Sequence, residues 1–519
     1  MSNKKLLKGA FILALAGLAA KFLGVFFKIP LQRLIGDEGM GLFGLPYPLY
    51  TLMLSISITG FPAAISKLIS ERLAYEDIEG ANRIFKISLA MLMLIGLFSS
   101  AFLFFGAEYI IALLNWPQDA YYSILGLSIA PLFVSIMSAF RGYFQGMQFM
   151  GPTAISQIVE QVGRVVIGVG LSYYTISMGI GYAAGAASFG ASAGAILGVV
   201  VLVIYYFLFN QGPRRIYFKP TNKDIQQKMS SWEVVREIIW FAIPISIGGV
   251  LSSIMTLIDA VMVPSRLIQG GYSSAEITVL YGQLTGKAVT LVNVPLTFSI
   301  AMAASIIPAI AESYSKNNSY ELKHKIKSAM KTTIIIALPA AAGLYLLAPQ
   351  IIGLLWGQGE AGGHILRILS FNVIFISIGQ ILGSILQGMN RVYIPLRSLL
   401  IGAIIKVVVS YYLLMSSLNI LGAVMGSIAG YCVVMVLNYI EVKKTIGFKI
   451  EIKNSILKPI MATIFMTLAI YYIHPWMQTR LQSENIATLI SVAAAMIVYF
   501  LTIYISKAVD LKESIIGKR

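Results

Sequence analysis

The sequence predicts an all-α polytopic membrane protein with about fourteen transmembrane helices. Three observations lead to this fold class. First, 57% of the 519 residues are hydrophobic and only 12% are charged, about half the charged fraction of a soluble protein. Second, apolar stretches of about twenty residues, the length that crosses a bilayer as a helix, recur along the whole chain. Third, the basic residues gather on alternate connecting segments.

The apolar stretches give two sets of six helices and a final pair. We expect the first set at 6–29, 40–65, 84–106, 122–145, 153–175 and 182–209; the second at 235–263, 278–311, 329–348, 364–388, 395–415 and 420–440; and the pair at 455–474 and 485–506. The expected domains are therefore an N-terminal lobe (1–209), a cytoplasmic linker (210–234), a C-terminal lobe (235–440), and the last helix pair with a cytoplasmic tail (441–519).

The distribution of the 39 lysines and arginines predicts the orientation. With the N-terminus inside, thirty of them fall on cytoplasmic segments, six fall inside spans, and only Arg33, Arg266 and Arg480 fall outside. A miscounted helix would invert every later loop and remove this bias. Both termini are therefore expected in the cytoplasm. The formal charge of +17 indicates contact with anionic membrane lipids and no nucleic-acid partner.

Weak internal similarity indicates a duplication. Residues 145–147 and Arg164 match residues 387–389 and Lys406 at one offset of 242, and 61–71 resembles 307–316. Because each repeat holds an even number of helices, the two repeats should be parallel and related by an axis along the membrane normal. This arrangement favours a cavity between two lobes, as in alternating-access transporters. A duplicated bundle without transport is the alternative.

Charged residues inside the spans give the main functional clue, because each is costly in lipid and should face a partner or a cavity. Six are basic and two are acidic: Lys21, Lys28, Glu160, Arg164, Asp259, Lys287, Arg367 and Lys406. Lys21 and Lys28 lie two helical turns apart on one face. With Lys287 they form the predicted site for an anionic headgroup such as phosphate or pyrophosphate. Asp259 either neutralises Lys287 or binds a coupling cation.

The other intramembrane charges have simpler structural interpretations. Glu160 and Arg164 are four residues apart and should form a structural ion pair, with a role as substrate ligands as the alternative. Lys406 repeats Arg164 but has Gly402 where the first repeat has Glu160. Arg367, near an external helix end, can snorkel. The single cysteine and three scattered histidines predict neither a metal site nor any cofactor.

Several longer motifs indicate a family. RGYFQG (141–146) followed by GPTAISQIVEQVGR (151–164), LIGDEGMGLF (34–43) and YGQLTGKAVTLVNVP (281–295) resemble the stage V sporulation protein B group of the multidrug/oligosaccharidyl-lipid/polysaccharide exporter superfamily. That group is similar to the MurJ lipid II flippases. In those flippases, basic residues on helices 1 and 8 line the central cavity. Lys21, within AAKFLG, resembles the helix-1 pattern with lysine where arginine is common.

The resemblance implies a transporter of the bacterial cytoplasmic membrane, and no enzyme. Its substrate would be an undecaprenyl-pyrophosphate-linked peptidoglycan precursor, its role cell-wall or spore-cortex synthesis, and its partners membrane lipids and cell-wall synthesis enzymes. No nucleotide-binding GxxxxGK[ST] motif is present, so a membrane potential or ion gradient is the expected energy source. A cation-coupled multidrug exporter of the same superfamily and a non-transporting scaffold for cell-wall synthesis are the alternatives.

Overall fold

The computed structural model describes residues 3–57, 59–211, 230–357, 361–448 and 451–506. Within these ranges the regular structure is helical, without strands. Fourteen helical segments of the described residues are long and apolar enough to span a membrane, which confirms the predicted count. Most of the predicted linker (210–234) and the C-terminal tail lie outside the described residues, as do the first two residues.

The chain forms two compact units. Unit 1 comprises residues 1–268 and 272–282, and unit 2 comprises residues 269–271 and 283–519. The helices of unit 1 are α1 (Asn3–Gly44), α2 (Tyr47–Ser57), α3 (Phe61–Ala74), α4 (Ile78–Leu114), α5 (Ala120–Ser128), α6 (Ala130–Gly146), α7 (Met150–Thr175), the short η1 (Ile176–Met178), α8 (Ile180–Gln211), α9 (Ser231–Gln269, whose last residue falls in unit 2) and α10 (Ser274–Gly282).

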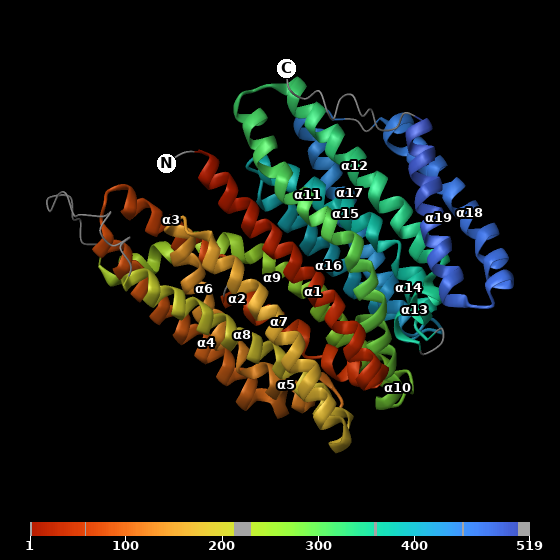
Figure 1. Cartoon of the computed structure of the whole chain (residues 1–519), viewed down its shortest axis with the longest axis horizontal. Coiled ribbons are helices and arrows are strands. Elements are labelled where there is room, and N and C mark those ends of the chain that lie inside the picture. Colours follow the sequence, from red (N-terminus) through yellow and green to blue (C-terminus); the bar gives the residue numbers. More distant parts are fainter. Residues whose placement is uncertain (1–2, 58, 212–229, 358–360, 449–450, 507–519) are drawn as a thin grey trace. The chain divides into compact units, whose positions relative to one another are not determined.

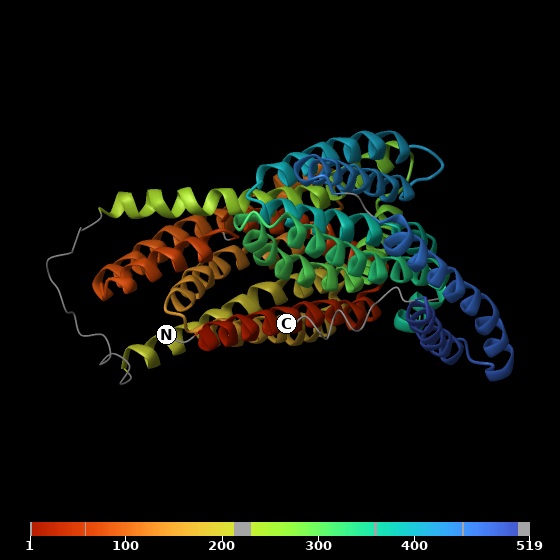
Figure 2. The same cartoon turned by 90° about the horizontal axis from the view of Figure 1, so that it is seen from above.

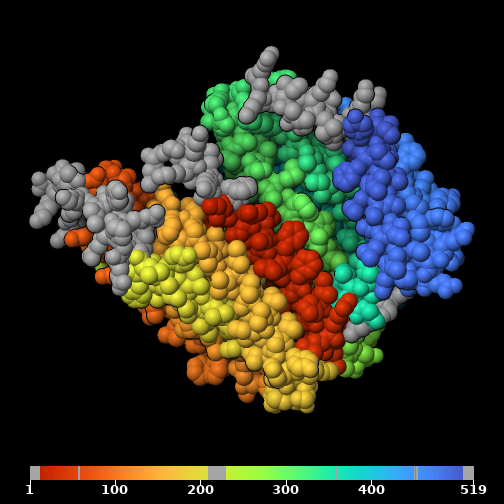
Figure 3. All heavy atoms as spheres, in the orientation of Figure 1, coloured from red at the N-terminus to blue at the C-terminus, as the bar shows by residue number. Residues whose placement is uncertain are grey.

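Unit 2 begins with a π-helical turn. Its elements are η4 (Gln283–Ala288), α11 (Val289–Ser315), α12 (Ser319–Leu346), α13 (Ala348–Trp356), α14 (Gly363–Leu369), α15 (Asn372–Gly388), α16 (Tyr393–Leu413), α17 (Leu421–Ile446), η5 (Ile452–Leu457), α18 (Lys458–Leu481) and α19 (Glu484–Ile505). The last pair, α18 and α19, pack along each other and form one continuous blue surface in Figure 3. Their buried core includes Met466, Ile470 and Tyr499.

Breaks within the spans follow from proline and glycine. The second span is expected to begin at residue 40. In the structure α1 continues to Gly44, and α2 begins at Tyr47, between Pro46 and Pro48, so the predicted boundary is too early. Gly36, at φ 68° and ψ −172°, kinks α1, a conformation that glycine adopts without a Cβ penalty. Arg33, expected in an external loop, therefore lies in α1.

The predicted duplication is visible in the backbone. The helices α6 and α15 each have 17 residues and begin and end at the offset of 242 found in the sequence. The left-handed residues Gln148 (φ 55°) and Asn390 (φ 60°) follow them at the same offset. Gly146 and Gly388 also play the same packing role, because a Cβ at either would lie 2.8 Å from an isoleucine Cβ on the helix it crosses. The two repeats therefore share local geometry as well as sequence.

The helix α9 follows the predicted linker but belongs to unit 1 by its contacts. Ser253 on α9 bonds Ser55 on α2, Oγ to Oγ, at 2.9 Å, and the Gly60 amide donates to Ser246 Oγ at 3.2 Å. Trp116 Nε1 donates to the Ala260 carbonyl at 2.8 Å. The boundary between the two compact units, near residue 282, therefore lies later in the chain than the boundary between the two repeats. The predicted lobes, 1–209 and 235–440, describe the duplication and stay a prediction as domains.

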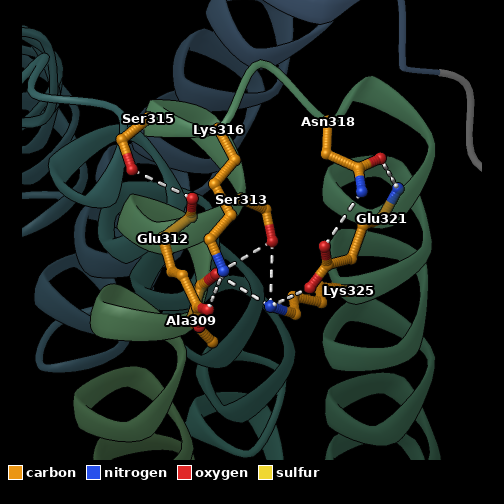
Figure 4. Close-up of polar contacts among 8 residues, drawn as sticks. All are labelled: Ala309, Glu312, Ser313, Ser315, Lys316, Asn318, Glu321 and Lys325. Atoms are coloured by element: carbon orange, nitrogen blue, oxygen red, sulfur yellow. Dashed lines mark hydrogen bonds and ion pairs between the residues drawn. The ribbon is translucent and has the colours of Figure 1, made fainter.

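The junction of α11 and α12 shows how a turn in unit 2 is fixed (Figure 4). Asn318 caps α12 by accepting from the Glu321 amide at 3.1 Å. Lys325 Nζ lies 2.6 Å from Glu321 Oε1 and donates to Ser313 Oγ at 2.8 Å and to the Ala309 carbonyl at 3.2 Å. The lysine therefore ties the end of α11 to the start of α12. In Figure 2 the same two helices (green) run side by side.

Candidate functional site

The most extensive buried charge network of unit 1 joins α6 and α7. Arg141 Nη2 donates to Glu160 Oε2 at 2.9 Å, and Arg164 Nη2 lies 3.4 Å from Glu160 Oε1. The three side chains are only 11% to 16% exposed. The predicted pair of Glu160 and Arg164 is therefore present, and Arg141 makes it a network of three charges. Its two guanidinium groups and one carboxylate leave a net charge of +1.

Two tyrosines of α2 extend this network. Tyr47 Oη accepts a hydrogen bond of 3.0 Å from Arg164 Nη1. Tyr50 stacks edge-on against Tyr47, with ring centroids 5.6 Å apart, and is 1% exposed. The α2 helix thus brings a phenolic surface to the guanidinium of Arg164. This arrangement presents hydrogen-bond donors and positive charge in an apolar span, where both are stronger than in water.

Local sequence explains why these groups meet. Glu160 and Arg164 are one helical turn apart on α7 and share a face. Arg141 reaches the same face from α6, and its Nε also donates to Ser156 Oγ, one turn before Glu160, at 3.1 Å. Gly194 of α8 allows close approach to α7, since a Cβ there would lie 2.3 Å from the Glu160 carbonyl. The network is therefore built on closely packed, rigid helices.

The predicted headgroup lysines are distributed over both units. Lys21 and Lys28 lie on α1 in unit 1, and Lys287 lies in unit 2. Lys28 is half-buried, whereas the Lys21 side chain lies outside the described residues. Asp259, half-buried on α9, belongs to unit 1. The grouping of these residues into one cavity stays a prediction.

Lys287 occupies the π-helical turn between α10 and α11. Its side chain is fully buried, and Nζ donates to the Ala361 carbonyl at 3.2 Å. A π turn widens the helix by one residue and is common at functional sites. Gly362, just beyond that carbonyl, adopts φ 92°, and a Cβ on it would lie 3.7 Å from Lys287 Cδ. The buried lysine therefore packs against the backbone of Ala361 and Gly362 within a membrane-spanning segment.

The remaining intramembrane cations differ in burial. Lys406 on α16 is 2% exposed. Arg367 on α14 is exposed, and its Cζ lies 5.9 Å from the centroid of the Tyr345 ring, which is within cation–π range. Arg367 thus covers an aromatic ring at the surface of unit 2, which is consistent with the expected snorkelling role. Lys406 is a core residue of the second repeat.

Sequence reasoning missed Arg141 and Tyr47. Arg141 stands four residues before the expected end of its span, and it was counted with the basic cytoplasmic segments. The helix α6 continues through it to Gly146. The signal that could have found it is the position of Arg141 inside the expected span 122–145. Tyr47 carries no such signal, because aromatic residues are frequent in every span.

Comparisons with known proteins agree with this architecture. The family model described as Polysaccharide biosynthesis protein matches residues 6–314, and the MatE model matches residues 244–412. The chain is 29% identical to Lipid II flippase MurJ of Bacillus subtilis (strain 168), over 89% of this chain and 87% of that protein. It is 26% identical to Stage V sporulation protein B of the same organism, over 88% and 86%.

Solved structures show the same fold. A structure of lipid II flippase MurJ in an inward closed conformation matches with a TM-score of 0.71 at 16% identity, covering 98% of this chain and 100% of that one. An inward-facing multidrug resistance MATE transporter matches with a TM-score of 0.69 at 16% identity, covering 83% and 94%. These matches confirm the resemblance to the exporter superfamily expected from the motifs. With a family model spanning residues 6–314, more than half of its length, the chain belongs to the polysaccharide biosynthesis protein family of membrane transporters.

Proposed function

We propose that this transporter moves a polyprenyl-pyrophosphate-linked oligosaccharide, such as a lipid II-like peptidoglycan precursor, across the bacterial cytoplasmic membrane. The observation that carries the proposal is the cationic interior of the spans. Lys287 and Lys406 are buried, and the Arg141–Glu160–Arg164 network has a net positive charge. Intramembrane charges of one sign mark the path of a ligand of the opposite sign. A diphosphate is such a ligand, and similarity to a protein named lipid II flippase supports it.

In this proposal the polar headgroup crosses between two lobes while the polyprenyl tail stays in lipid. Lys21, Lys28 and Lys287 would hold the pyrophosphate. One partner of Lys287 is the neutral carbonyl oxygen of Ala361, and an anionic phosphate oxygen would form a stronger, charge-assisted bond with this lysine. Asp259 would act as a counter-charge or bind a coupling ion. The similarity to a protein named Stage V sporulation protein B supports a role in cell-wall or spore-cortex synthesis. Cell-wall synthesis enzymes would be its partners, and the distribution of basic residues supports a cytoplasmic position of both termini.

A second candidate function is export of cationic drugs, favoured by the MatE match over residues 244–412 and by the fold of MATE transporters. Binding of a cationic drug requires an acidic site in the interior. In the described part of the network on α6 and α7, the carboxylate of Glu160 already faces two guanidinium groups. The charge balance therefore favours an anionic substrate. A non-transporting scaffold for cell-wall synthesis is the third candidate, and it predicts no substrate movement.

The test is a flipping assay in proteoliposomes that contain the full chain. A fluorescent lipid II-like substrate and a cationic dye are supplied in separate experiments. Lys287→Gln removes the buried charge and keeps much of the side-chain volume. Lys323→Gln removes an exposed charge of the same sign and is the matched control. We expect movement of the lipid substrate, and a loss of about tenfold or more in Lys287→Gln alone.

Two outcomes would contradict the proposal. Transport of the dye without the lipid-linked substrate would assign the drug-export function, and transport of neither would support the scaffold. If the lipid substrate moves and Lys287→Gln moves it as fast as wild type, the flippase function stands and the assignment of Lys287 fails. Lys21→Ala, measured in the same way, tests the predicted site on α1 separately.

A further inference from the structure

We propose that Arg164, with Tyr47 and Tyr50, forms an oxyanion-binding site within unit 1, and that Arg141 is the positioning residue that holds Glu160 beside it. The inference rests on the proposed function and deepens it. It assigns recognition of the anionic group to the α2–α7 contact, in addition to the predicted lysines. The sequence alone favours a structural ion pair at these positions. The geometry separates the two arginines into different roles.

Arg141 is held firmly by α7. Its Nε donates to Ser156 Oγ at 3.1 Å and its Nη2 donates to Glu160 Oε2 at 2.9 Å. The two bonds fix both the orientation of the guanidinium and the carboxylate it faces. One strong, charge-assisted bond at this distance is sufficient to neutralise Glu160. The pair of Arg141 and Glu160 is therefore complete without Arg164.

Arg164 is held more loosely by the protein. Its contact with Glu160 Oε1 is 3.4 Å long, and its Nη1 donates to the neutral oxygen of Tyr47 at 3.0 Å. Its Nε is buried and has no hydrogen-bond acceptor in the described part of the chain. A buried guanidinium N–H without an acceptor costs free energy, and in native proteins such a group usually bonds to a water, an ion or a ligand.

Tyr50 supplies a second, independent indication of a ligand. Its hydroxyl is buried and has no hydrogen-bond partner among the residues that the structure describes, and the side chain is 1% exposed. Tyr50 stacks on Tyr47, which accepts the hydrogen bond from Arg164. The unused groups are therefore an N–H of Arg164 and the O–H of the tyrosine that packs against its hydrogen-bond partner. Both can donate, which suits an acceptor-only ligand.

Charge selects the class of ligand. A water molecule or a carbonyl would satisfy the two donors but would leave the net positive charge of the network uncompensated. A phosphate or carboxylate oxyanion satisfies the donors and neutralises the charge at once. The guanidinium edge formed by Nε and Nη2 can hold two oxygens of such an anion, which a lysine could not do. A diphosphate headgroup and a free phosphate share this chemistry.

Direct binding tests the site independently of transport. The full chain, purified in detergent, is titrated with inorganic pyrophosphate and with geranylgeranyl diphosphate in a calorimeter. Arg164→Gln is expected to weaken binding of both at least tenfold, and Tyr50→Phe about tenfold, because each removes a donor to a charged acceptor. The exposed Lys323→Gln variant is the charge-matched control and should bind as wild type. Tyr50→Phe preserves the ring, so it keeps the test valid if Arg164→Gln fails to fold.

The outcomes separate this inference from the proposed function. Tighter binding of the lipid than of inorganic pyrophosphate assigns the site to the lipid headgroup, and equal binding assigns it to the free anion; both support the site. The inference is refuted if wild type binds neither probe, or if Arg164→Gln and Tyr50→Phe bind within twofold of wild type. Intact binding without flipping would instead overturn the proposed function alone.

Discussion

Replacing Glu160 should destabilise the protein far more than replacing Arg164, although the two residues are partners in one ion pair. Glu160→Gln leaves two buried guanidinium groups without the carboxylate that now lies 2.9 Å from one and 3.4 Å from the other. Removing one partner from a buried pair costs about 3–5 kcal/mol. Arg164→Gln instead leaves the neutral pair of Arg141 and Glu160. It should cost about 1 kcal/mol, the value of the lost bond to Tyr47.

The magnitudes follow from the same distances. At an effective dielectric constant of about 20, a charge pair 3 to 3.5 Å apart is worth about 5 kcal/mol before desolvation. Glu160→Gln loses two such attractions and retains the repulsion between the arginines. Arg164→Gln loses one attraction but also removes that repulsion and the burial of a second guanidinium. The side chains are 11% to 16% exposed, so solvent screening weakens this difference only moderately.

Unfolding of the purified chain in mixed micelles of increasing dodecyl sulfate, followed by circular dichroism, measures the difference. Glu71→Gln is the matched control, because it breaks an exposed pair with Lys67 whose side chains are 44% and 53% exposed. Such a pair is worth about 0–1 kcal/mol. The reasoning fails if Glu160→Gln unfolds within about 1 kcal/mol of wild type, or if Arg164→Gln is the less stable of the two.

Three further predictions concern packing, topology and pH. Gly146→Ala should cost about 1–3 kcal/mol in the same unfolding assay, because its Cβ would lie 2.8 Å from the Ile69 side chain, whereas Gly170→Ala, with nothing within 4 Å, should cost nothing. A cysteine placed at Lys323 in a cysteine-free background should react with an impermeant maleimide only after the cells are opened; labelling of intact cells would invert the predicted topology. The hydrogen bond from Lys327 lowers the pKa of Glu451. The pair of Lys327 and Glu451 therefore stabilises the folded chain above the ordinary carboxyl pKa, and this stabilisation is lost as the pH falls through the lowered pKa of Glu451. The Tm difference between wild type and Lys327→Gln should shrink on acidification, and a constant difference would exclude this linkage.

The helix count could be predicted because it depends on summed properties of long segments. Hydropathy over about twenty residues and the alternation of basic loops tolerate local errors. Interruptions inside a span depend on a few residues. The break before Tyr47 and the π turn at 283–288 leave the average hydropathy unchanged. Only Pro46, Pro48 and the charge at Lys287 marked them, and prolines also occur within continuous helices such as α11.

The candidate site was only partly predictable because its partners come from different helices. A spacing of four identified Glu160 and Arg164 as neighbours on one helix. Whether another helix brings a third charge depends on how the helices pack. Arg141 reaches Glu160 because α6 packs with this residue, five positions before its end at Gly146, against α7. Tyr47 reaches Arg164 because α2 starts where α1 ends, and this contact has no counterpart in sequence periodicity.

The second repeat differs from the first at the position of the carboxylate. Lys406 occupies the position of Arg164, but Gly402 replaces Glu160. A Cβ at Gly402 would lie 2.7 Å from the Gly430 carbonyl and 2.6 Å from a Val434 methyl, so no carboxylate side chain fits between α16 and α17. In the first repeat Gly194 of α8 allows close approach to the Glu160 backbone, and the Glu160 side chain extends to Arg141 and Arg164. Both repeats thus have glycines on both helices of this contact, as Gly163 on α7 and Gly426 on α17 show. The repeats differ at the position of the carboxylate. Among the described residues, the arginine of the first repeat has Glu160 and Tyr47 as neighbours, and these neighbours make it a candidate oxyanion site.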